Sequence, residues 1–272
     1  MKSRRPISTA RRAVQKIRAG QSRALIRTVV NHVIGSKRIL WFQEIVEAFT
    51  GSRVVELGGP SWILGVKGPL PIYPVIRELD LVDFAPITIW TPSLVRRIIG
   101  DWKPKLPGKR IISDAVSLHV VEDGEYDGLL AAHVIEHLAN PVKALLEWKR
   151  IVREDGAILI VVPSNMGSFD HRRPITTVAH MISDFSDEVR EDDVSHLEEI
   201  LRLHDLNLDP SAGSIENFTR RSLENIHYRA LHHHVFDLES LSAVVKHIGL
   251  QVVTTALFEP GQIGILARRT HD

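Results

Sequence analysis

The chain has 272 residues, of which 44% are hydrophobic and 25% are charged, as in ordinary soluble globular proteins. It contains no cysteine, which excludes a disulfide framework, a thiolate metal site and a cysteine nucleophile. No apolar run reaches the roughly 20 residues that a membrane-spanning helix needs. We therefore expect a cytoplasmic protein of one large domain or two modest ones.

The charge is unevenly distributed, although the net formal charge is only +1. Residues 1–43 hold eleven Lys and Arg and no acidic residue, which leaves 23 basic against 33 acidic side chains in the rest of the chain. Within this segment Val14, Ile17 and Leu25 recur at helical spacing. We therefore predict a basic helical arm over residues 1–50. Such a helix can pack on the acidic remainder or on a second copy, lie on an anionic membrane, or bind nucleic acid.

After residue 51 short β-branched runs alternate with helical patterns, which predicts a doubly wound α/β fold with a mostly parallel, seven-stranded sheet. A helix at 39–49 leads into the first strand, a second from about 140 to 153 closes at Asp155-Gly156, and a third covers 238–248. The last two strands should be antiparallel because only a short turn joins them. Strands are expected at residues 53–57, 78–84, 110–113, 126–131, 157–162, 251–258 and 264–267.

One long segment breaks this alternation with polar helical patterns, and eight of the fourteen histidines fall between residues 164 and 236. The spacing of Leu197, Ile200 and Leu201 predicts an acidic helix within residues 184–209. The chain then divides into four expected parts: a basic arm at 1–50, the first part of a core at 51–163, a helical substrate cap at 164–235 and the end of the core at 236–272.

Polar residues follow the first three strands, where an open α/β sheet binds its ligands. Gly58-Gly59 follow the first strand. Glycine there allows a ligand to approach the backbone closely, but a tight turn between a strand and a helix, without any ligand, would use the same residues. Asp83 ends the second strand and Asp114 follows the third. A series of carboxylates at successive strand ends indicates a nucleotide-like ligand with hydroxyl and amino groups.

Five runs follow one another in the order VVELGGPS, ELDLVDF, IISDA, YDGLLAAHVIEHLANP and GAILIVVP. This order resembles that of class I S-adenosylmethionine-dependent methyltransferases. The resemblance covers about residues 51–163 and resumes at 236–269. It implies a Rossmann-like methyltransferase fold and S-adenosylmethionine as cofactor. A dinucleotide-binding dehydrogenase is disfavoured, because the first turn lacks the G-x-G-x-x-G spacing.

The resemblance also implies a role for each residue at the strand ends. Pro60 stands where the family has its second spaced glycine, and Asp80 is an alternative to Asp83 as the ribose carboxylate. The implied cofactor contacts are Glu56, Gly58 and Gly59, with Ser61 in the same turn, around the methionine moiety; Asp83 on the ribose; Asp114 and Ala115 at the adenine; and Ala132 and His133 beside the sulfonium.

The run His133-Val134-Ile135-Glu136-His137 spaces three ligand-bearing side chains at i, i+3 and i+4, which is one face of a helix. H-x-x-E-H also occurs in zinc peptidases, but here it follows a parallel strand in nucleotide-binding order. The run is similar to the E-x-x-E-H of metal-dependent O-methyltransferases, with His133 in place of the first glutamate. Two imidazoles suit magnesium poorly. We therefore expect no metal requirement, with Glu136 and His137 as the alternative ligands.

Methylation of a hydroxyl requires removal of its proton, and a neutral histidine is the usual base near pH 7. His232 and His234 are the first candidates, because alternate residues of an extended segment share one face. His171, His196 and His133 are further candidates. The histidine triplet also has a purely structural interpretation, and Arg172-Arg173 either bind an anionic acceptor group or pair with the acidic helix.

The insertion is similar to that of small bacterial methyltransferases that accompany glycosyltransferases in surface-polysaccharide synthesis. It shares an RR-P-x-T stretch, an acidic helix with a histidine and an H-x-H-V-aromatic return. The likeness implies transfer to an oxygen of a small or lipid-linked glycan. The basic arm, residues 1–40, would suit an acceptor made at the inner face of the membrane, and packing of the arm on a second copy makes a homodimer a further expectation. The alternatives are an RNA methyltransferase that uses the basic arm and a non-catalytic cofactor-binding protein.

Overall fold

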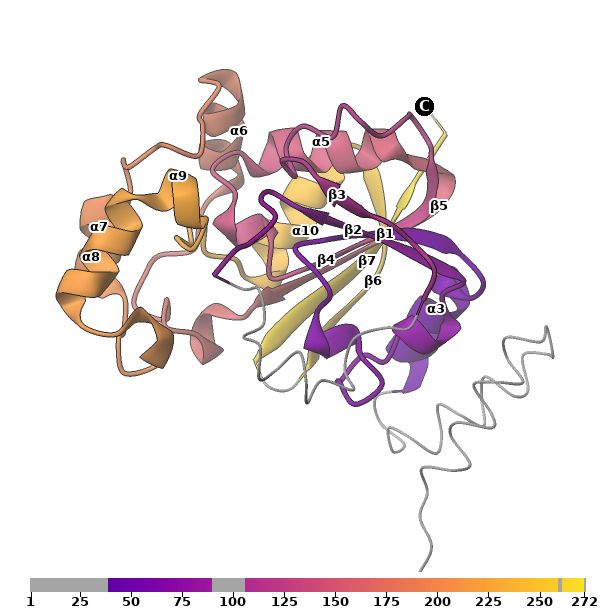
Figure 1. The fold of residues 1–272 in the computed structure, drawn as a ribbon, viewed down its shortest axis with the longest axis horizontal. Helices are drawn as coiled ribbons and strands as arrows, with labels where there is room; N and C mark the ends of the chain where they lie inside the picture. Colours follow the sequence, from indigo (N-terminus) through magenta and orange to yellow (C-terminus); the bar gives the residue numbers. More distant parts are fainter. Residues whose placement is uncertain (1–38, 90–105, 259–260, 272) are drawn as a thin grey trace, which may run out of the picture.

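The computed structural model describes residues 39–89, 106–258 and 261–271, so most of the predicted basic arm lies outside the described residues. A seven-stranded sheet of order β3-β2-β1-β4-β5-β7-β6 forms the centre (Figure 1). β7 runs antiparallel to β5 and β6, and the other pairs are parallel. The predicted doubly wound α/β fold is therefore confirmed. The strands are β1 (Arg53–Leu57), β2 (Glu78–Asp83), β3 (Arg110–Ile112), β4 (Tyr126–Ala132), β5 (Val152–Pro163), β6 (Leu250–Phe258) and β7 (Gln262–Arg269).

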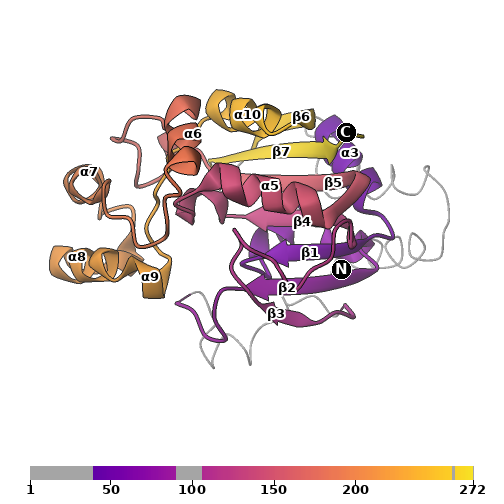
Figure 2. The same cartoon turned by 90° about the horizontal axis from the view of Figure 1, so that it is seen from above.

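Helices cover both faces of the sheet (Figure 2). On one face lie α5 (Pro141–Ile151) and α10 (Leu238–His247); on the other lie α3 (Ile39–Phe49) and the single turns η1 (Trp62–Leu64) and η2 (Tyr73–Val75). Successive strand residues point to opposite faces, so each strand supplies both cores. A sheet buried on both faces explains the nearly continuous apolar runs of β4 and β5.

The end of α5 differs from the expectation. Asn140 begins the helix, because its side chain accepts a hydrogen bond from the backbone N–H of Lys143. The helix ends at Ile151, however, and β5 starts directly after it, so Asp155-Gly156 lie within the strand. Asp155 has a φ of 58°, and the pairing of β4 with β5 shifts register in this region. Asp155-Gly156 therefore form a bulge rather than a helix cap.

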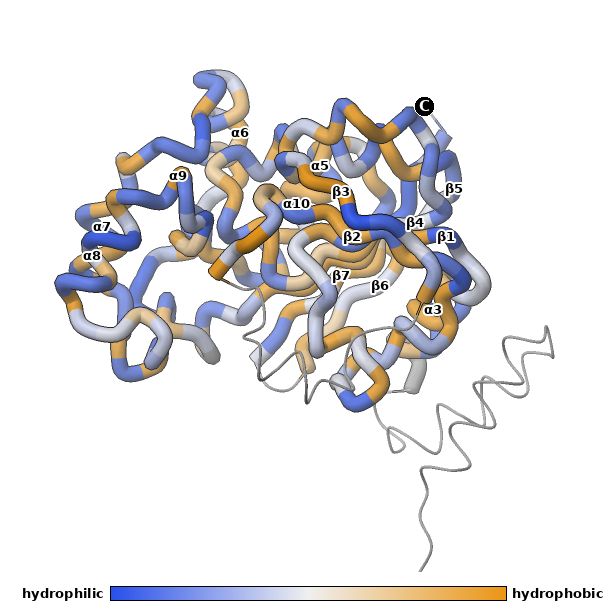
Figure 3. Tube along the Cα trace, in the orientation of Figure 1, coloured by the Kyte–Doolittle hydropathy of each residue, from blue (hydrophilic) through white to orange (hydrophobic). Residues whose placement is uncertain are grey.

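The insertion, residues 164–235, carries short helices beyond the ends of the parallel strands (Figure 2). The acidic helix predicted within residues 184–209 is present but short, as α7, and it is separated from the preceding α6 by turns that include the left-handed Glu188, with a φ of 53°. The insertion is mostly polar (Figure 3) and has a small apolar core of its own. Its helices are α6 (Val178–Ser186), α7 (Leu197–Leu203), α8 (Ile215–Leu223) and α9 (Asn225–Tyr228), with single turns η4 (Asn165–Gly167) and η5 (Pro210–Ala212).

Asp80 lies inside the sheet and not at its ligand-binding edge. Its carboxylate is 1% exposed and accepts hydrogen bonds from the Tyr126 hydroxyl at 2.8 Å, the Arg53 guanidinium at 3.1 Å and the Lys109 backbone N–H at 2.8 Å. Asp80 pairs in register with Val55 in the middle of β1. The alternative of Asp80 as the ribose carboxylate is therefore wrong, because all its contacts are structural.

Asp80→Ala is expected to lower the free energy of unfolding by about 3 kcal/mol, because it leaves the buried Tyr126 hydroxyl and two partly buried donors, on Arg53 and Lys109, without their acceptor. The matched control is Arg77→Ala, which removes the exposed partner of Asp127 at 3.9 Å and should cost about 0–1 kcal/mol. Urea denaturation measures both. Equal losses in the two variants would contradict the structural role of Asp80.

Candidate active site

The carboxyl ends of four parallel strands meet along one edge of the sheet. Leu57 pairs with Val82 of β2 and with Ala131 of β4, while Asp83 pairs with Ile112 of β3. The residues just beyond these pairs must therefore lie side by side. The structure thus brings together the glycine turn and three of the predicted side chains, which are Asp83, Asp114 and His133.

The first turn is shaped to hold a ligand against the backbone. Gly58 is exposed and has a φ of +65°, which favours glycine. A Cβ on Gly59 would lie 2.3 Å from the Glu56 carboxyl carbon, so the chain passes directly over that side chain. Such a turn leaves its outer side clear of side chains, and it fits the close approach of a cofactor.

Glu56 supports this turn from beneath. Its fully buried carboxyl accepts hydrogen bonds from the Ser61 backbone N–H at 2.9 Å and from the Tyr73 hydroxyl at 2.8 Å. The Ser61 hydroxyl in turn accepts a hydrogen bond from the N–H of Ile63 and begins η1. The expected direct contact of Glu56 with a ligand is not what the structure shows, because Gly59 covers the carboxyl.

Burial raises the pKa of Glu56 to about 8. Between its ordinary pKa near 4.5 and this value, the folded state binds more protons than the unfolded state. The stability that this group contributes is therefore present below pH 4.5 and is lost progressively as the pH rises toward 8.

Glu56→Gln is expected to remove this pH dependence. A glutamine can mimic the protonated acid: its carbonyl accepts from Ser61, and its amide donates to the Tyr73 oxygen, whose hydroxyl donates to the Ser61 carbonyl at 3.0 Å. The wild type should lose about 1.4 kcal/mol per pH unit relative to the variant within the window between the two pKa values. Urea denaturation at pH 5, 6.5 and 8 gives the difference, and parallel profiles would contradict the assignment.

The two aspartates of the edge are each paired with a guanidinium group. Asp83 accepts hydrogen bonds from Arg110 at 2.7 and 2.9 Å through one carboxylate oxygen. Asp114 accepts from the Val116 N–H at 3.1 Å and from Arg229 at 2.9 Å. A carboxylate has about four lone-pair sites, so each of these groups can accept further hydrogen bonds from a ligand.

Arg229 links the insertion to this edge, and the sequence analysis missed it. The residue follows α9 with a φ of 52°. Its guanidinium reaches Asp114 at 2.9 Å and Glu191 at 3.2 Å, and it lies 5.5 Å from the centre of the Phe84 ring. Burial raises the pKa of Glu191 to about 7 against the opposing effect of Arg229. No local sequence pattern marks a contact between residues 115 positions apart.

His133 stands at the end of β4 with 38% of its side chain exposed. Its backbone has a φ of 57°, and its N–H donates to the Val161 carbonyl at 2.8 Å. The imidazole Nε2 lies 2.6 Å from the Gln262 side-chain oxygen, and Nδ1 lies 3.9 Å from a carboxylate oxygen of Glu136. Gln262, at the start of β7, was also missed, since only the tertiary fold brings it to His133.

The expected helical face of His133, Glu136 and His137 is wrong. Only one turn of 3-10 helix, η3 (Ile135–His137), follows His133, whose left-handed backbone interrupts the helical path, although its ring still lies 3.9 Å from Glu136. Glu136 and His137 instead form a buried cluster with His232, and ligand atoms of the three residues lie within 4.8 Å of one another. Burial raises the pKa of Glu136 and lowers that of His137. His232 thus joins the two alternative metal ligands.

The other predicted bases lie on the insertion. His232 is buried, and its Nδ1 lies 2.6 Å from Asp170; burial lowers its pKa, but the Asp170 carboxylate more than compensates and raises it. His234 is 1% exposed and faces Asp184. The expected arrangement with both rings around an acceptor is therefore not what the structure shows, because both lie inside the insertion. His171, in contrast, is exposed.

The arginine pair has separate roles. Arg173 is buried and pairs with Asp170 at 3.1 Å and with Glu199 of α7 at 2.9 Å. Its guanidinium also donates to the carbonyls of His232 and His233. Of the two roles predicted for the arginine pair, Arg173 therefore has the structural one, which is pairing with acidic residues of the insertion. Arg172 is exposed and contacts Asp205 at 2.7 Å.

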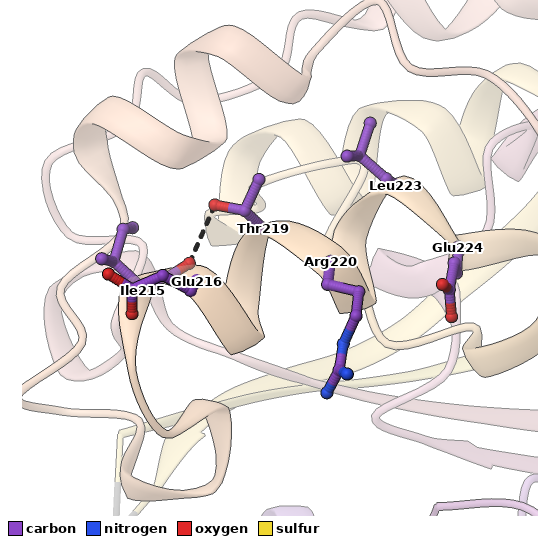
Figure 4. A pocket seen from close by; sticks show the side chains of 6 residues that line it. All are labelled: Ile215, Glu216, Thr219, Arg220, Leu223 and Glu224. Carbon is purple, nitrogen blue, oxygen red and sulfur yellow. Dashed lines mark hydrogen bonds between the residues drawn. The ribbon is translucent and has the colours of Figure 1, made fainter.

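A surface hollow of about 440 Å³ lies on the insertion, away from the sheet edge (Figure 4). One helix and the residue after it form the whole lining, and the Thr219 hydroxyl only bonds its own helix, at the Ile215 carbonyl. We assign no ligand to it, because no polar groups from separate elements converge there. The lining residues are Ile215, Glu216, Thr219, Arg220, Leu223 and Glu224. In the described part of the chain, no helix is both long and apolar enough to cross a bilayer.

Comparison with known proteins adds the family. A family model described as a methyltransferase domain matches residues 84–255, and no curated protein matches the sequence. Similar solved structures include a SAM-dependent methyltransferase from Aquifex aeolicus (12% identity, 93% of this chain and 97% of that chain, TM-score 0.45). Others are an S-adenosylmethionine-dependent methyltransferase from Mesorhizobium loti (11%, 86% and 99%, 0.46) and the N-methyltransferase NodS from Bradyrhizobium japonicum WM9 (11%, 86% and 96%, 0.45).

The chemistry of the edge agrees with the family match. The exposed glycine turn lets a ligand approach the protein backbone closely. The two aspartates at successive strand ends can accept hydrogen bonds from the hydroxyl and amino groups of S-adenosylmethionine. The family model spans well over half of the chain; it begins immediately after β2 and includes the ends of β3 and β4. The chain therefore belongs to the methyltransferase-domain family and is a class I S-adenosylmethionine-dependent methyltransferase.

Proposed function

We propose that this methyltransferase transfers the methyl group to a hydroxyl oxygen of a sugar in a glycan acceptor, with His133 as the general base. S-adenosylmethionine, when bound, supplies an electrophilic methyl group on its sulfonium. The observation that carries the proposal is the partly exposed imidazole of His133 at the end of β4, which lies between Gln262 and Glu136.

The strand ends are the proposed cofactor contacts. Asp83 would accept the ribose hydroxyls through its carboxylate, and the Gly58-Gly59 turn would take the methionine part. Asp114 and Ala115 would border the adenine. Ala132 and His133 come next along the same edge, so they would lie closest to the reacting methyl group.

A hydroxyl acceptor explains why a base stands at this position. The proton of a sugar hydroxyl must leave as the carbon–oxygen bond forms, and a positioned base assists this step. We assign the tautomer of His133 from its contact with Gln262: Nε2–H donates to the side-chain oxygen at 2.6 Å, which leaves Nδ1 as the proton acceptor. Glu136, 3.9 Å from Nδ1, then stabilises the imidazolium that forms.

The choice of a glycan as the acceptor is based on the insertion. Residues 164–235 act as the substrate cap in this proposal, and their likeness to the insertions of polysaccharide-associated methyltransferases supports a sugar. His171 and Arg172 are exposed at the beginning of this cap and can bind a sugar hydroxyl or an anionic group of the acceptor. His171 is therefore the second candidate for the base.

The test is a turnover assay with four acceptor classes: free sugars, a lipid-linked oligosaccharide, small amines and RNA. Release of S-adenosylhomocysteine reports turnover, and mass spectrometry of the product locates the methyl group. A methyl group on a sugar oxygen supports the proposal. Transfer to an amine nitrogen or to RNA, with none to any sugar, overturns it.

The location of the acceptor is a separate part of the proposal. Residues 1–40 carry the basic excess and would hold the enzyme at an anionic membrane surface, where a lipid-linked glycan is made. Co-sedimentation of the intact chain with anionic vesicles at low salt tests this part. Binding that disappears in the presence of high salt supports it, and no binding at low salt overturns it.

A further inference from the structure

A second group of chemistry-bearing side chains lies in the insertion, apart from the strand ends. His180, Asp184 and His234 bring their ligand atoms together there, and His196 contacts His180; we call these four residues the histidine cluster. His180 and Asp184 lie on α6, His196 immediately precedes α7, and His234 lies in the return segment between α9 and α10.

Local structure directs each side chain to one point. His180 and Asp184 are four residues apart on α6 and therefore share one face of that helix. His196 is the N-cap residue of α7 but makes no side-chain capping bond, so its ring is available for the cluster. The backbone N–H of His234 donates to the Glu136 carbonyl, which fixes the return segment beside the core.

Three of the four side chains bring their ligand atoms within 4.8 Å of one another, namely His180, Asp184 and His234. His180 Nε2 lies 3.5 Å from Asp184 Oδ2, and His234 Nε2 lies 3.7 Å from the same oxygen and 3.3 Å from the Ala139 carbonyl oxygen. His196 enters through His180, whose Nε2 lies 2.9 Å from its own Nε2. In a tetrahedral zinc site with bonds of about 2.0 Å, two ligand atoms stand about 3.3 Å apart. The measured separations fall on both sides of that value.

Asp184 makes the cluster more than a histidine network. The residue is 7% exposed, and its Oδ2, which faces the imidazoles, accepts no hydrogen bond from a described residue. A buried carboxylate oxygen without a donor is costly. Burial also lowers the pKa values of His196 and His234, and the neutral imidazole is the form that binds metal.

We propose that His180, Asp184, His196 and His234 bind one divalent transition-metal ion, zinc by the chemistry of the set. Three imidazole nitrogens and one carboxylate oxygen suit zinc, whereas magnesium and calcium prefer oxygen ligands. Four protein ligands leave no open position, which is typical of a structural site rather than a catalytic one.

The ion would hold together a part of the fold that has little apolar packing. The insertion has a small apolar core, which consists of Ile200, Ala212, Phe218 and Leu231. A metal bound by α6, the start of α7 and the return segment would join α6, which contributes no residue to this core, to α7, which does. The site is independent of the proposed sugar acceptor, since none of its ligands lies at the strand ends.

The experiment uses the full chain, stripped of metal with a chelator and then titrated with Co²⁺, followed by Zn²⁺ as competitor. The expected result is one Co²⁺ per chain with the visible absorption of a tetrahedral site, displaced by one Zn²⁺. Elemental analysis gives the stoichiometry, and saturating Zn²⁺ should raise Tm by about 5 °C. No binding of either ion at micromolar concentration overturns the proposal.

Variants locate the ion. His196→Ala removes a partly exposed ligand and should weaken Zn²⁺ binding at least 100-fold, and Asp184→Asn should do the same without loss of volume. The matched control is His227→Ala, an exposed histidine of the same insertion, which should bind like the wild type. Circular dichroism checks that each variant is folded. Binding that survives in both cluster variants but is lost in Glu136→Gln would place the ion in the other buried cluster and overturn the proposal.

Discussion

His133→Asn is expected to lower kcat at least 100-fold while leaving the Kd for S-adenosylmethionine within about twofold, because general-base catalysis contributes about 10²–10⁴. Asparagine is the suitable replacement, since the φ of 57° at this position is tolerated by asparagine better than by most other residues. The change thus removes the imidazole without straining the end of β4. Steady-state kinetics with the sugar acceptor measure kcat, and calorimetry measures the Kd.

The control is His271→Asn. His271 is an exposed histidine paired with Glu154, beyond the end of β7, at the opposite edge of the sheet. This variant should have the kcat of the wild type. In His133→Gly, which also accepts a positive φ, added imidazole should restore part of the activity. An unchanged kcat in His133→Asn together with a large loss in His171→Asn would move the base to the insertion.

The core could be predicted from the sequence because its signals are local. β-branched runs between glycine and proline breakers specify where the strands lie, although β5 begins at Val152, earlier than its apolar run. The parallel order then forces Gly58, Asp83 and Asp114 to one edge, without any knowledge of side-chain contacts. The confirmed seven strands follow from the same reasoning.

The rest of the site depends on contacts that no local pattern reveals. Gln262 is 129 positions from His133, and Arg229 is 115 positions from Asp114. The H-x-x-E-H run shows a second limit of sequence-based prediction. Its spacing fits one face of a helix, but His133 has a left-handed backbone and therefore does not belong to a helix with Glu136 and His137. Histidine itself is also ambiguous, because the same ring serves as a buried hydrogen-bond partner, a base or a metal ligand.

Asp83→Ala is expected to weaken the binding of both S-adenosylmethionine and S-adenosylhomocysteine by about 100-fold. A carboxylate that accepts two ribose hydroxyls makes charge-assisted hydrogen bonds worth about 1.5–3 kcal/mol each, part of which water recovers. Both ligands carry the same ribose, so their affinities should fall by the same factor. Isothermal titration with each ligand measures the two values.

Two variants separate this role from a loss of fold or of charge. Asp123→Ala removes an exposed carboxylate just before β4, at the opposite edge, and should bind both ligands like the wild type. Arg110→Ala removes the guanidinium that holds one oxygen of Asp83 at 2.7 Å and should leave binding equal or tighter, because the carboxylate then has more lone pairs for the ribose. Weaker binding in Arg110→Ala, with no effect of Asp83→Ala, would assign the nucleoside to the guanidinium. We expect the opposite result: Asp83→Ala weakens cofactor binding and Arg110→Ala does not. Because His133→Asn should lower kcat alone, the three variants together would distinguish a residue that binds the cofactor from one that takes part in the reaction.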